Sequence, residues 1–137
     1  MSRTRESDYA LGAQNEAECL SSISAYLRTD MELNPNMYGE MDYHNSDRTI
    51  WAEVKRRYCS HDRFDTIIIG KNKVDFLKNN PASRGTFFWK FNDGLYCVEY
   101  NNEAFERYTM DQFTRTDRGD SPSLVYYIPT SDLRQVL

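Results

Sequence analysis

In the segment 50–57, with the sequence IWAEVKRR, small or β-branched apolar side chains at 50, 52 and 54 alternate with larger or charged side chains at 51, 53 and 55. Successive side chains of a β-strand point to opposite faces, so this period of two predicts a strand. One face of the strand carries Glu53 and Lys55 as neighbours, and the other carries Ala52 and Val54. Because the apolar face must pack against a core, we expect a fold built around a sheet that is buried on this side.

A second strand is expected just before this one. Residues 37–43 have strand character, and the polar run 44–48 separates them from the strand expected at 49–57. Two strands joined by a short polar turn form an antiparallel hairpin. Pairing across this hairpin predicts that Asp42 lies beside Glu53.

The remaining segments predict an α/β (α+β) fold in a single domain over residues 1–137. A chain of this length can bury one core, and its ten tyrosines, seven phenylalanines and two tryptophans argue against disorder. We expect a central mixed β-sheet flanked by helices, in the order α-β-β-α-β-β-β-α. Besides the first hairpin, the expected elements are a helix over 8–28, a helix over 71–79, strands over 85–91 and 95–100 joined by Asn92-Asp93-Gly94, a strand over 124–128 and a helix over 132–137. The run 66–70 is strand-like or buried and is not counted in this order.

The first predicted helix carries one acidic residue on its apolar side. Glu16 precedes Leu20, Ile23 and Leu27 by four, seven and eleven residues, which places all four on one face. A buried carboxylate is unfavourable unless it is paired or bound to a cation. Glu16 is therefore a candidate partner for the two carboxylates of the hairpin.

These side chains suit a Mg²⁺ site that hydrolyses phosphodiesters, because Mg²⁺ prefers hard oxygen ligands and keeps several waters. The candidate ligands are the carboxylates of Asp42, Glu53 and Glu16 and the backbone carbonyl of Val54. A bound cation lowers the pKa of a water and neutralises charge on the phosphate, and we expect Mn²⁺ to substitute. Lysine is a poor metal ligand, so Lys55 is the candidate group for orienting or deprotonating the water and for stabilising the transition state.

The charge distribution favours DNA as a partner, although the net charge is -4. Residues 48–90 carry ten basic and four acidic side chains, whereas the rest of the chain carries seven and seventeen. A local basic surface attracts phosphate even on an acidic protein. Arg56 and Arg57 extend the predicted strand and point to opposite faces, so one of them can join Lys55 on a phosphate-binding surface while the other forms an ion pair.

The carboxylates and the lysine follow the order and spacing of a known motif. The chain resembles the PD-(D/E)xK nuclease superfamily in Asp42, in Glu53-Val54-Lys55 eleven residues later, and in Gly12 and Glu16 of the preceding helix. The resemblance covers roughly residues 9–91. It implies a restriction-endonuclease-like core and a Mg²⁺-dependent endonuclease that leaves 5′-phosphate and 3′-hydroxyl ends.

In size and layout the chain is most similar to the archaeal-type Holliday-junction resolvases of that superfamily. This similarity implies a homodimer that cuts branched DNA during recombination or repair. Met41 departs from the family pattern, in which a proline is common at this position. The second helix of family members often supplies a basic or polar contact to the phosphate, which here implies Lys71 or Lys73.

Other features bear on the compartment and on alternative sites. No apolar run approaches the roughly 18 to 20 residues that cross a bilayer, and the N-terminus lacks the apolar core of a signal peptide, so an intracellular protein without a membrane partner is expected. Cys19, Cys59 and Cys97 form no metal-ligand pattern and are expected to be reduced thiols, with Cys19 and Cys97 in the core. His44 and His61 are expected to be polar loop residues and not zinc ligands.

Two other functions stay open from the sequence. A non-catalytic nucleic-acid or protein-binding module could keep this fold, although an intact Asp42, Glu53 and Lys55 argues against it. A structural or interaction protein could use the acidic segment 101–120, which no period assigns to a helix or strand. A simpler interpretation of Glu53 and Lys55 is that they form the solvated face of an edge strand.

Overall fold

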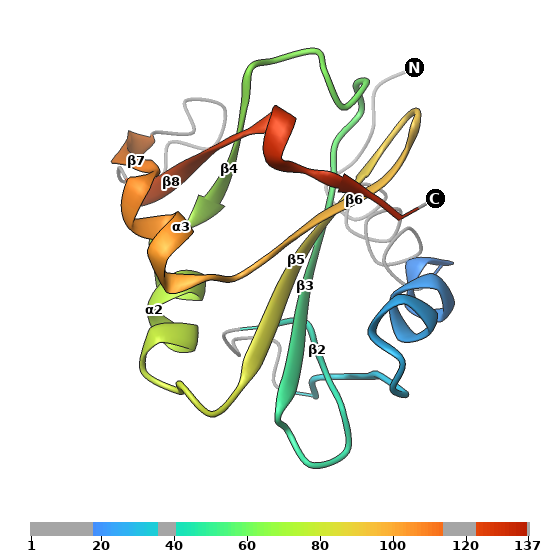
Figure 1. Cartoon of the computed structure of the whole chain (residues 1–137). Helices are drawn as coiled ribbons and strands as arrows, with labels where there is room; N and C mark the ends of the chain where they lie inside the picture. Colours follow the sequence, from blue (N-terminus) through green and yellow to red (C-terminus); the bar gives the residue numbers. More distant parts are fainter. Residues whose placement is uncertain (1–17, 36–40, 114–122, 137) are drawn as a thin grey trace.

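The computed structural model of the chain describes residues 18–35, 41–113 and 123–136. Within them the strands form two sheets, a six-stranded sheet of order β1-β2-β3-β5-β6-β9 and a three-stranded sheet of order β4-β8-β7 (Figure 1). The strands of the six-stranded sheet are β1 (Glu32–Leu33), β2 (Tyr43–His44), β3 (Ile50–Arg56), β5 (Arg84–Phe91), β6 (Gly94–Glu99) and β9 (Arg134–Gln135). The strands of the three-stranded sheet are β4 (Thr66–Gly70), β7 (Thr109–Phe113) and β8 (Ser123–Pro129).

The helices of the described residues are short. They are the helical residues 18–27, α2 (Lys71–Lys78), α3 (Asn102–Arg107) and the 3-10 helix η1 (Thr130–Asp132). None of these helices combines the length and the apolar character that crossing a bilayer requires.

The six-stranded sheet is mixed because β3 and β5 run parallel, whereas its other neighbouring strands pair antiparallel. The chain passes from β3 to β5 through β4 and α2, which is the kind of crossover that parallel strands require. The strand with the predicted charged face, β3, lies between β2 and β5. Neighbours on both sides therefore fix the positions of its side chains.

Different layers cover the two faces of the six-stranded sheet (Figure 1). Helix 18–27 covers one face, where Ile23 and Val54 belong to the same buried cluster. On the other face, α2, α3 and the three-stranded sheet enclose a second cluster, which includes Leu77 and Phe87. The alternation predicted for β3 is confirmed, since its apolar side chains face helix 18–27.

A glycine lets α2 sit close to the sheet. A Cβ atom on Gly85 of β5 would lie 2.3 Å from Cδ1 of Leu77, which is itself fully buried. Only a residue without a side chain leaves room for this approach. The contact holds the lysines of α2 over the face of the sheet that carries Glu53.

Many of the predicted elements are confirmed. The structure contains the antiparallel pair β2–β3, the strand at 66–70, a helix over 71–78, the hairpin β5–β6 and a strand at 123–129. The mixed central sheet with flanking helices is also present. Cys19, Cys59 and Cys97 are free thiols, and Cys19 and Cys97 are buried.

The predicted order of elements is wrong in four places, one of which is that it leaves out β4. The chain ends in η1 and β9 where a helix over 132–137 was expected, because residue 136 is drawn onto the sheet by a hydrogen bond from its N–H to the Leu95 carbonyl (2.7 Å). The segment 101–120 contains α3 and β7, and β1 precedes the first hairpin. Strands β4 and β8 pair with each other in a separate sheet and do not join the central one.

The turn between β2 and β3 is closed by the side chain of Asn45. Its Oδ1 accepts hydrogen bonds from the backbone N–H groups of Thr49 (2.9 Å) and Ile50 (3.0 Å). Within the turn, Arg48 adopts a positive φ of 59°. This closure sets the register of the hairpin and with it the place of Asp42 beside β3.

Replacing Asn45 by alanine should lower the free energy of unfolding by about 1 to 3 kcal/mol, because two backbone N–H groups lose their acceptor, the side chain of the buried Asn45. Denaturation in urea measures this change. Ser46→Ala, at an exposed position of the same turn, is the control and should change stability by less than about 0.5 kcal/mol. Equal stability of the two variants would contradict the role given to Asn45.

Candidate functional site

Glu53 and Lys55 of β3 point to the face covered by α2 and the three-stranded sheet. The side chain of Glu53 is almost completely buried, at 1% exposure, whereas that of Lys55 is 41% exposed. Their terminal atoms, Oε1 and Nζ, lie 3.7 Å apart. The strand thus presents a buried acid beside an accessible base.

Asp42 lies immediately before β2 and is held against β3. Its Oδ2 accepts a hydrogen bond from the backbone N–H of Val54 (3.0 Å). Asn34 holds the same stretch from the other side, because its backbone N–H donates to the Asp42 carbonyl (2.8 Å) and its Nδ2 donates to the Met41 carbonyl (3.0 Å). The hairpin therefore brings Asp42 next to Glu53, as the sequence pattern predicted.

The electrostatic environment of Glu53 is strongly perturbed. The pKa of Glu53 is raised to about 8, chiefly by burial and also by the negative charge and hydrogen bonding of Asp42, while Lys55 and Lys73 partly oppose the shift. Two carboxyl groups that share a small space disfavour each other's ionisation. Without a further positive charge, Glu53 is therefore mostly protonated at neutral pH.

One oxygen of Glu53 lacks a well-directed partner. Oε2 lies 3.2 Å from Nζ of Lys73, which makes an ion pair, but it accepts no hydrogen bond of good geometry from the described residues. A buried carboxylate oxygen in this condition is unfavourable unless a cation compensates it. Asp42 and Glu53 offer oxygen donors of the type that Mg²⁺ binds, so the two residues fit a divalent cation.

Next to these residues lies a cavity of about 570 Å³. It opens between β3, the start of α2 and the three-stranded sheet. The residues that line it are Lys55, Arg57, Ile68, Ile69, Gly70, Asn72, Lys73, Phe113, Ser123 and Val125. Among these described residues three are basic and none is acidic, so the part of the cavity that they line is positively charged.

The four basic residues predicted to bind DNA occupy different places. Arg57 and Lys73 line the cavity together with Lys55. Arg56 instead donates from its guanidinium to the backbone carbonyls of Arg57 (2.6 Å) and Lys90 (2.9 Å), which ties together the ends of β3 and β5. Lys71 forms an ion pair with Asp75 (2.5 Å) on the same helix. Arg57 and Lys73 are thus the two that the fold brings to the site.

Glu16 and Gly12 lie outside the described residues, as does Glu40 of the first predicted hairpin strand. The helical residues 18–27 that follow Glu16 pack on the face of the sheet opposite to Glu53. The prediction that Glu16 is a third carboxylate of the site stays a prediction.

His44 differs from the expectation of a polar loop residue. His44 is buried in β2 at 2% exposure, its Nδ1 donates to the Asn45 carbonyl (2.6 Å), and its ring packs against Trp51. The prediction was wrong because the strand extends one residue further into the sequence that was assigned to the turn.

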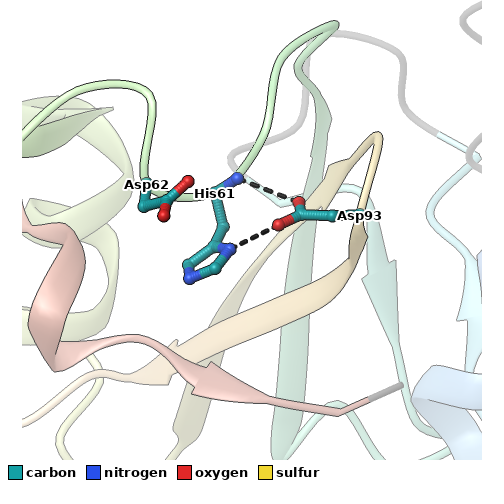
Figure 2. A group of neighbouring side chains, drawn as sticks. All are labelled: His61, Asp62 and Asp93. Atoms are coloured by element: carbon teal, nitrogen blue, oxygen red, sulfur yellow. Dashed lines mark hydrogen bonds and ion pairs between the residues drawn. The ribbon is translucent and has the colours of Figure 1, made fainter.

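His61 lies in a loop, as expected, and pairs with the turn between β5 and β6 (Figure 2). Its backbone N–H donates to Oδ1 of Asp93 (2.9 Å), and its Nδ1 lies 2.5 Å from Oδ2. The hydrogen bonds from His61 lower the pKa of Asp93, and the imidazole stacks on Tyr96 with 4.3 Å between ring centroids. Together with Asp62 these residues are of the types that bind metals, but the contacts described here already explain their arrangement as an anchor for the loop after β3.

Several residues of the cavity were not anticipated from the sequence. Asn72 and Gly70 belong to the junction of β4 and α2, and Phe113, Ser123 and Val125 come from the three-stranded sheet. Their contribution depends on the pairing of β4 with β8, which joins segments almost 60 residues apart in the chain. Of these residues only Phe113 is conspicuous in the sequence, as an aromatic residue in the polar segment 101–120.

The site thus combines two adjacent carboxyl groups, one of them buried, with two lysines and a basic cavity. Comparison of the chain with models of protein families, with curated proteins and with solved structures finds no match.

Proposed function

We propose that the protein is a Mg²⁺-dependent endonuclease that hydrolyses phosphodiester bonds in DNA, with a restriction-endonuclease-like core of the PD-(D/E)xK type. The observation that supports this best is the buried carboxyl group of Glu53, which lies beside Asp42 and contacts two lysines. A structural ion pair would use one acid and one base. Here a second carboxyl group, that of Asp42, lies beside the buried carboxyl group of Glu53, an arrangement that suits a site for a cation.

Asp42 and Glu53 would hold the Mg²⁺ ion, and Mn²⁺ should replace it. The carbonyl of Val54 is a further candidate ligand, because the N–H and C=O groups of one strand residue point to the same side and the Val54 N–H points to Asp42. When bound, the ion supplies an activated water and neutralises negative charge on the phosphate.

Lys55 acts next to this position. Its side chain is held by Glu53 at one end of the cavity and is open to solvent, so its ammonium group can donate hydrogen bonds to a phosphate oxygen or orient a water. A fixed positive charge stabilises the additional negative charge of the transition state. Lys73 contacts Glu53 from α2, and this ion pair holds the carboxylate oxygens of Glu53 in place when Glu53 is ionised.

The basic cavity provides attraction for the DNA backbone. Lys55, Arg57 and Lys73 are grouped on one side of a protein whose net charge is -4, so the local field favours phosphate although the whole chain is acidic. Cutting at branches, flaps or junctions, as in Holliday-junction resolvases, is the specificity that we propose. A homodimer would place two such sites on two strands.

The experiment uses labelled branched, single-stranded and linear duplex DNA, incubated in Mg²⁺, Mn²⁺ or EDTA. Cleavage should require the metal, and both Asp42→Asn and Lys55→Ala should lower its rate by roughly a hundredfold or more. Lys78→Ala removes the same charge from the far end of α2 and should change the rate less than about threefold.

Binding without cleavage in either metal would contradict this proposal and would favour a non-catalytic DNA-binding module. Cleavage that continues undiminished in Lys55→Ala would show that Lys55 has another role, even if the protein is a nuclease.

A further inference from the structure

The cavity beside Lys55 has a polar side and an apolar side. The polar side is formed by Lys55, Arg57 and Lys73, together with the first residues of α2. The apolar side is formed by β4, β7 and β8, where Phe113 and Val125 face the same space. This division matches a ligand that carries a negative group at one end and a flat apolar group at the other.

The polar side is suited to a phosphate group. Besides its three cations, it contains the N-terminus of α2, where Gly70 provides no side-chain cap and the first turn has no acidic residue. Backbone N–H groups at such a position, and the positive end of the helix dipole, favour an anion. A phosphate held here would be close to Lys55, which also contacts Glu53.

The apolar side is suited to a nucleobase. Phe113 lines the cavity and is 38% exposed, so part of its ring is accessible to a ligand. All nucleobases can stack on aromatic side chains, so this contact does not depend on the DNA sequence. Behind it, Val125 is buried at 5% exposure and gives the cavity a fixed floor.

The size of the cavity limits what can enter. At about 570 Å³ it lies in the range of pockets that enclose small molecules. In a duplex the bases are stacked and paired inside, so an enzyme that holds a base in a pocket must take it out of the helix. A nucleotide that is already unpaired enters without this loss.

We propose that this cavity binds one unpaired nucleotide of the DNA substrate, with its phosphate at Arg57, Lys73 and the start of α2 and its base against Phe113. This inference rests on the proposed nuclease function and specifies its substrate: DNA with an unpaired nucleotide next to the bond that is cut. Fully paired duplex is then a poor substrate.

The test compares three fluorescent duplexes of the same sequence. One is fully paired, one carries a single bulged thymidine, and one carries a bulged abasic residue at the same place. Binding is measured by anisotropy in Mg²⁺ with the Glu53→Gln variant, which should not cut. The same measurement is made with double variants that combine Glu53→Gln with Phe113→Ala, with Phe113→Leu or with the control Met110→Ala. Met110 is exposed on the same strand but lies on its other face.

The thymidine bulge should bind roughly five- to a hundredfold more tightly than the paired duplex, the range expected for stacking of one base. Both substitutions of Phe113 should remove most of this advantage, and Leu keeps the bulk of the side chain, so the loss would not reflect misfolding. Neither should affect the abasic bulge, and Met110→Ala should change nothing. Equal binding of the three duplexes, or equal weakening of all three by Phe113→Ala, would overturn the inference.

Cleavage by the wild-type protein separates this inference from the proposed function. If the wild type cuts DNA in Mg²⁺ but binding shows no dependence on the bulged base, the nuclease assignment stands and the nucleotide pocket is wrong. If binding depends on the base and on Phe113 but no DNA is cut, the pocket stands and the nuclease assignment is wrong.

Discussion

Glu53→Gln is expected to abolish cleavage and, in the absence of metal, to make the protein more stable than the wild type at alkaline pH. The rate should fall on the order of a thousandfold or more, because the glutamine amide cannot replace a carboxylate as a ligand for the cation. The gain in stability follows from the raised pKa of the buried Glu53 carboxyl group.

The direction of the stability change comes from the two pKa values of Glu53. The folded pKa is about 8, above the ordinary glutamate pKa of 4.5 that applies to the unfolded chain. The stability from this group is therefore fully present below about pH 4.5, decreases as the pH rises and is lost above about pH 8. Over this window the loss is on the order of 5 kcal/mol. Glutamine does not ionise, so the variant keeps its stability.

Thermal or urea denaturation in EDTA at pH 5 and pH 9 measures the effect. From pH 5 to pH 9 the free energy of unfolding of the variant should increase relative to that of the wild type by several kcal/mol, which corresponds to roughly 10 °C in Tm. Glu99→Gln is the matched control, because Glu99 is an exposed residue in an ion pair with Arg84. If Glu53→Gln behaves like Glu99→Gln, the buried carboxyl group is not in the environment described here.

The affinity of the protein for Mg²⁺ is expected to depend steeply on pH. A proton and the cation compete for the Glu53 carboxylate, whose pKa is about 8 in the metal-free protein. The apparent affinity should therefore increase about tenfold for each unit by which the pH rises toward 8, and it should level off above pH 8. Between pH 6 and pH 8 the change is roughly a hundredfold.

Calorimetric titration with Mg²⁺ or Mn²⁺ over this range measures the affinity and the number of protons released. About one proton should be released per ion at pH 6, and almost none at pH 9. Glu53→Gln should bind the metal weakly and without this pH dependence. An affinity that stays constant from pH 6 to pH 8 in the wild type would show that the ion does not bind to Glu53.

Local patterns in the sequence were sufficient to predict the part of the fold that carries Asp42, Glu53 and Lys55. The alternation of residues 50–57 specified which side of β3 is charged, and the polar turn before it specified that Asp42 would lie alongside. Both are short-range features, since strand periodicity and turn chemistry act within a few residues. The structure reproduces both.

Elements defined by distant partners could not be predicted in this way. The six residues of α3 are too few to show a helical period, although Asn101 caps the helix by accepting a hydrogen bond from the N–H of Ala104 (3.0 Å). Residues 132–137 follow a serine, the residue type that often caps a helix and that favoured a helix here, yet β9 forms because the edge of β6 is available for pairing. Pairing energy from the tertiary structure outweighs weak local preference here.

The same distinction applies to the site. The positions of Glu53 and Lys55 follow from one strand, whereas the cavity depends on the three-stranded sheet, whose strands come from separate parts of the chain. The contact of Lys73 with Glu53 also depends on how α2 packs against β5. Sequence analysis predicted both lysines as functional, but the geometry of the second one requires the fold.

Anomalous diffraction from crystals grown in Mn²⁺ tests most directly whether Asp42 and Glu53 bind one divalent cation. The prediction is a single strong peak that contacts the carboxylates of both residues and is absent from crystals of Glu53→Gln. Mn²⁺ bound only at His61 and Asp93, or a wild-type site with both carboxylates ordered and no ion, would contradict it.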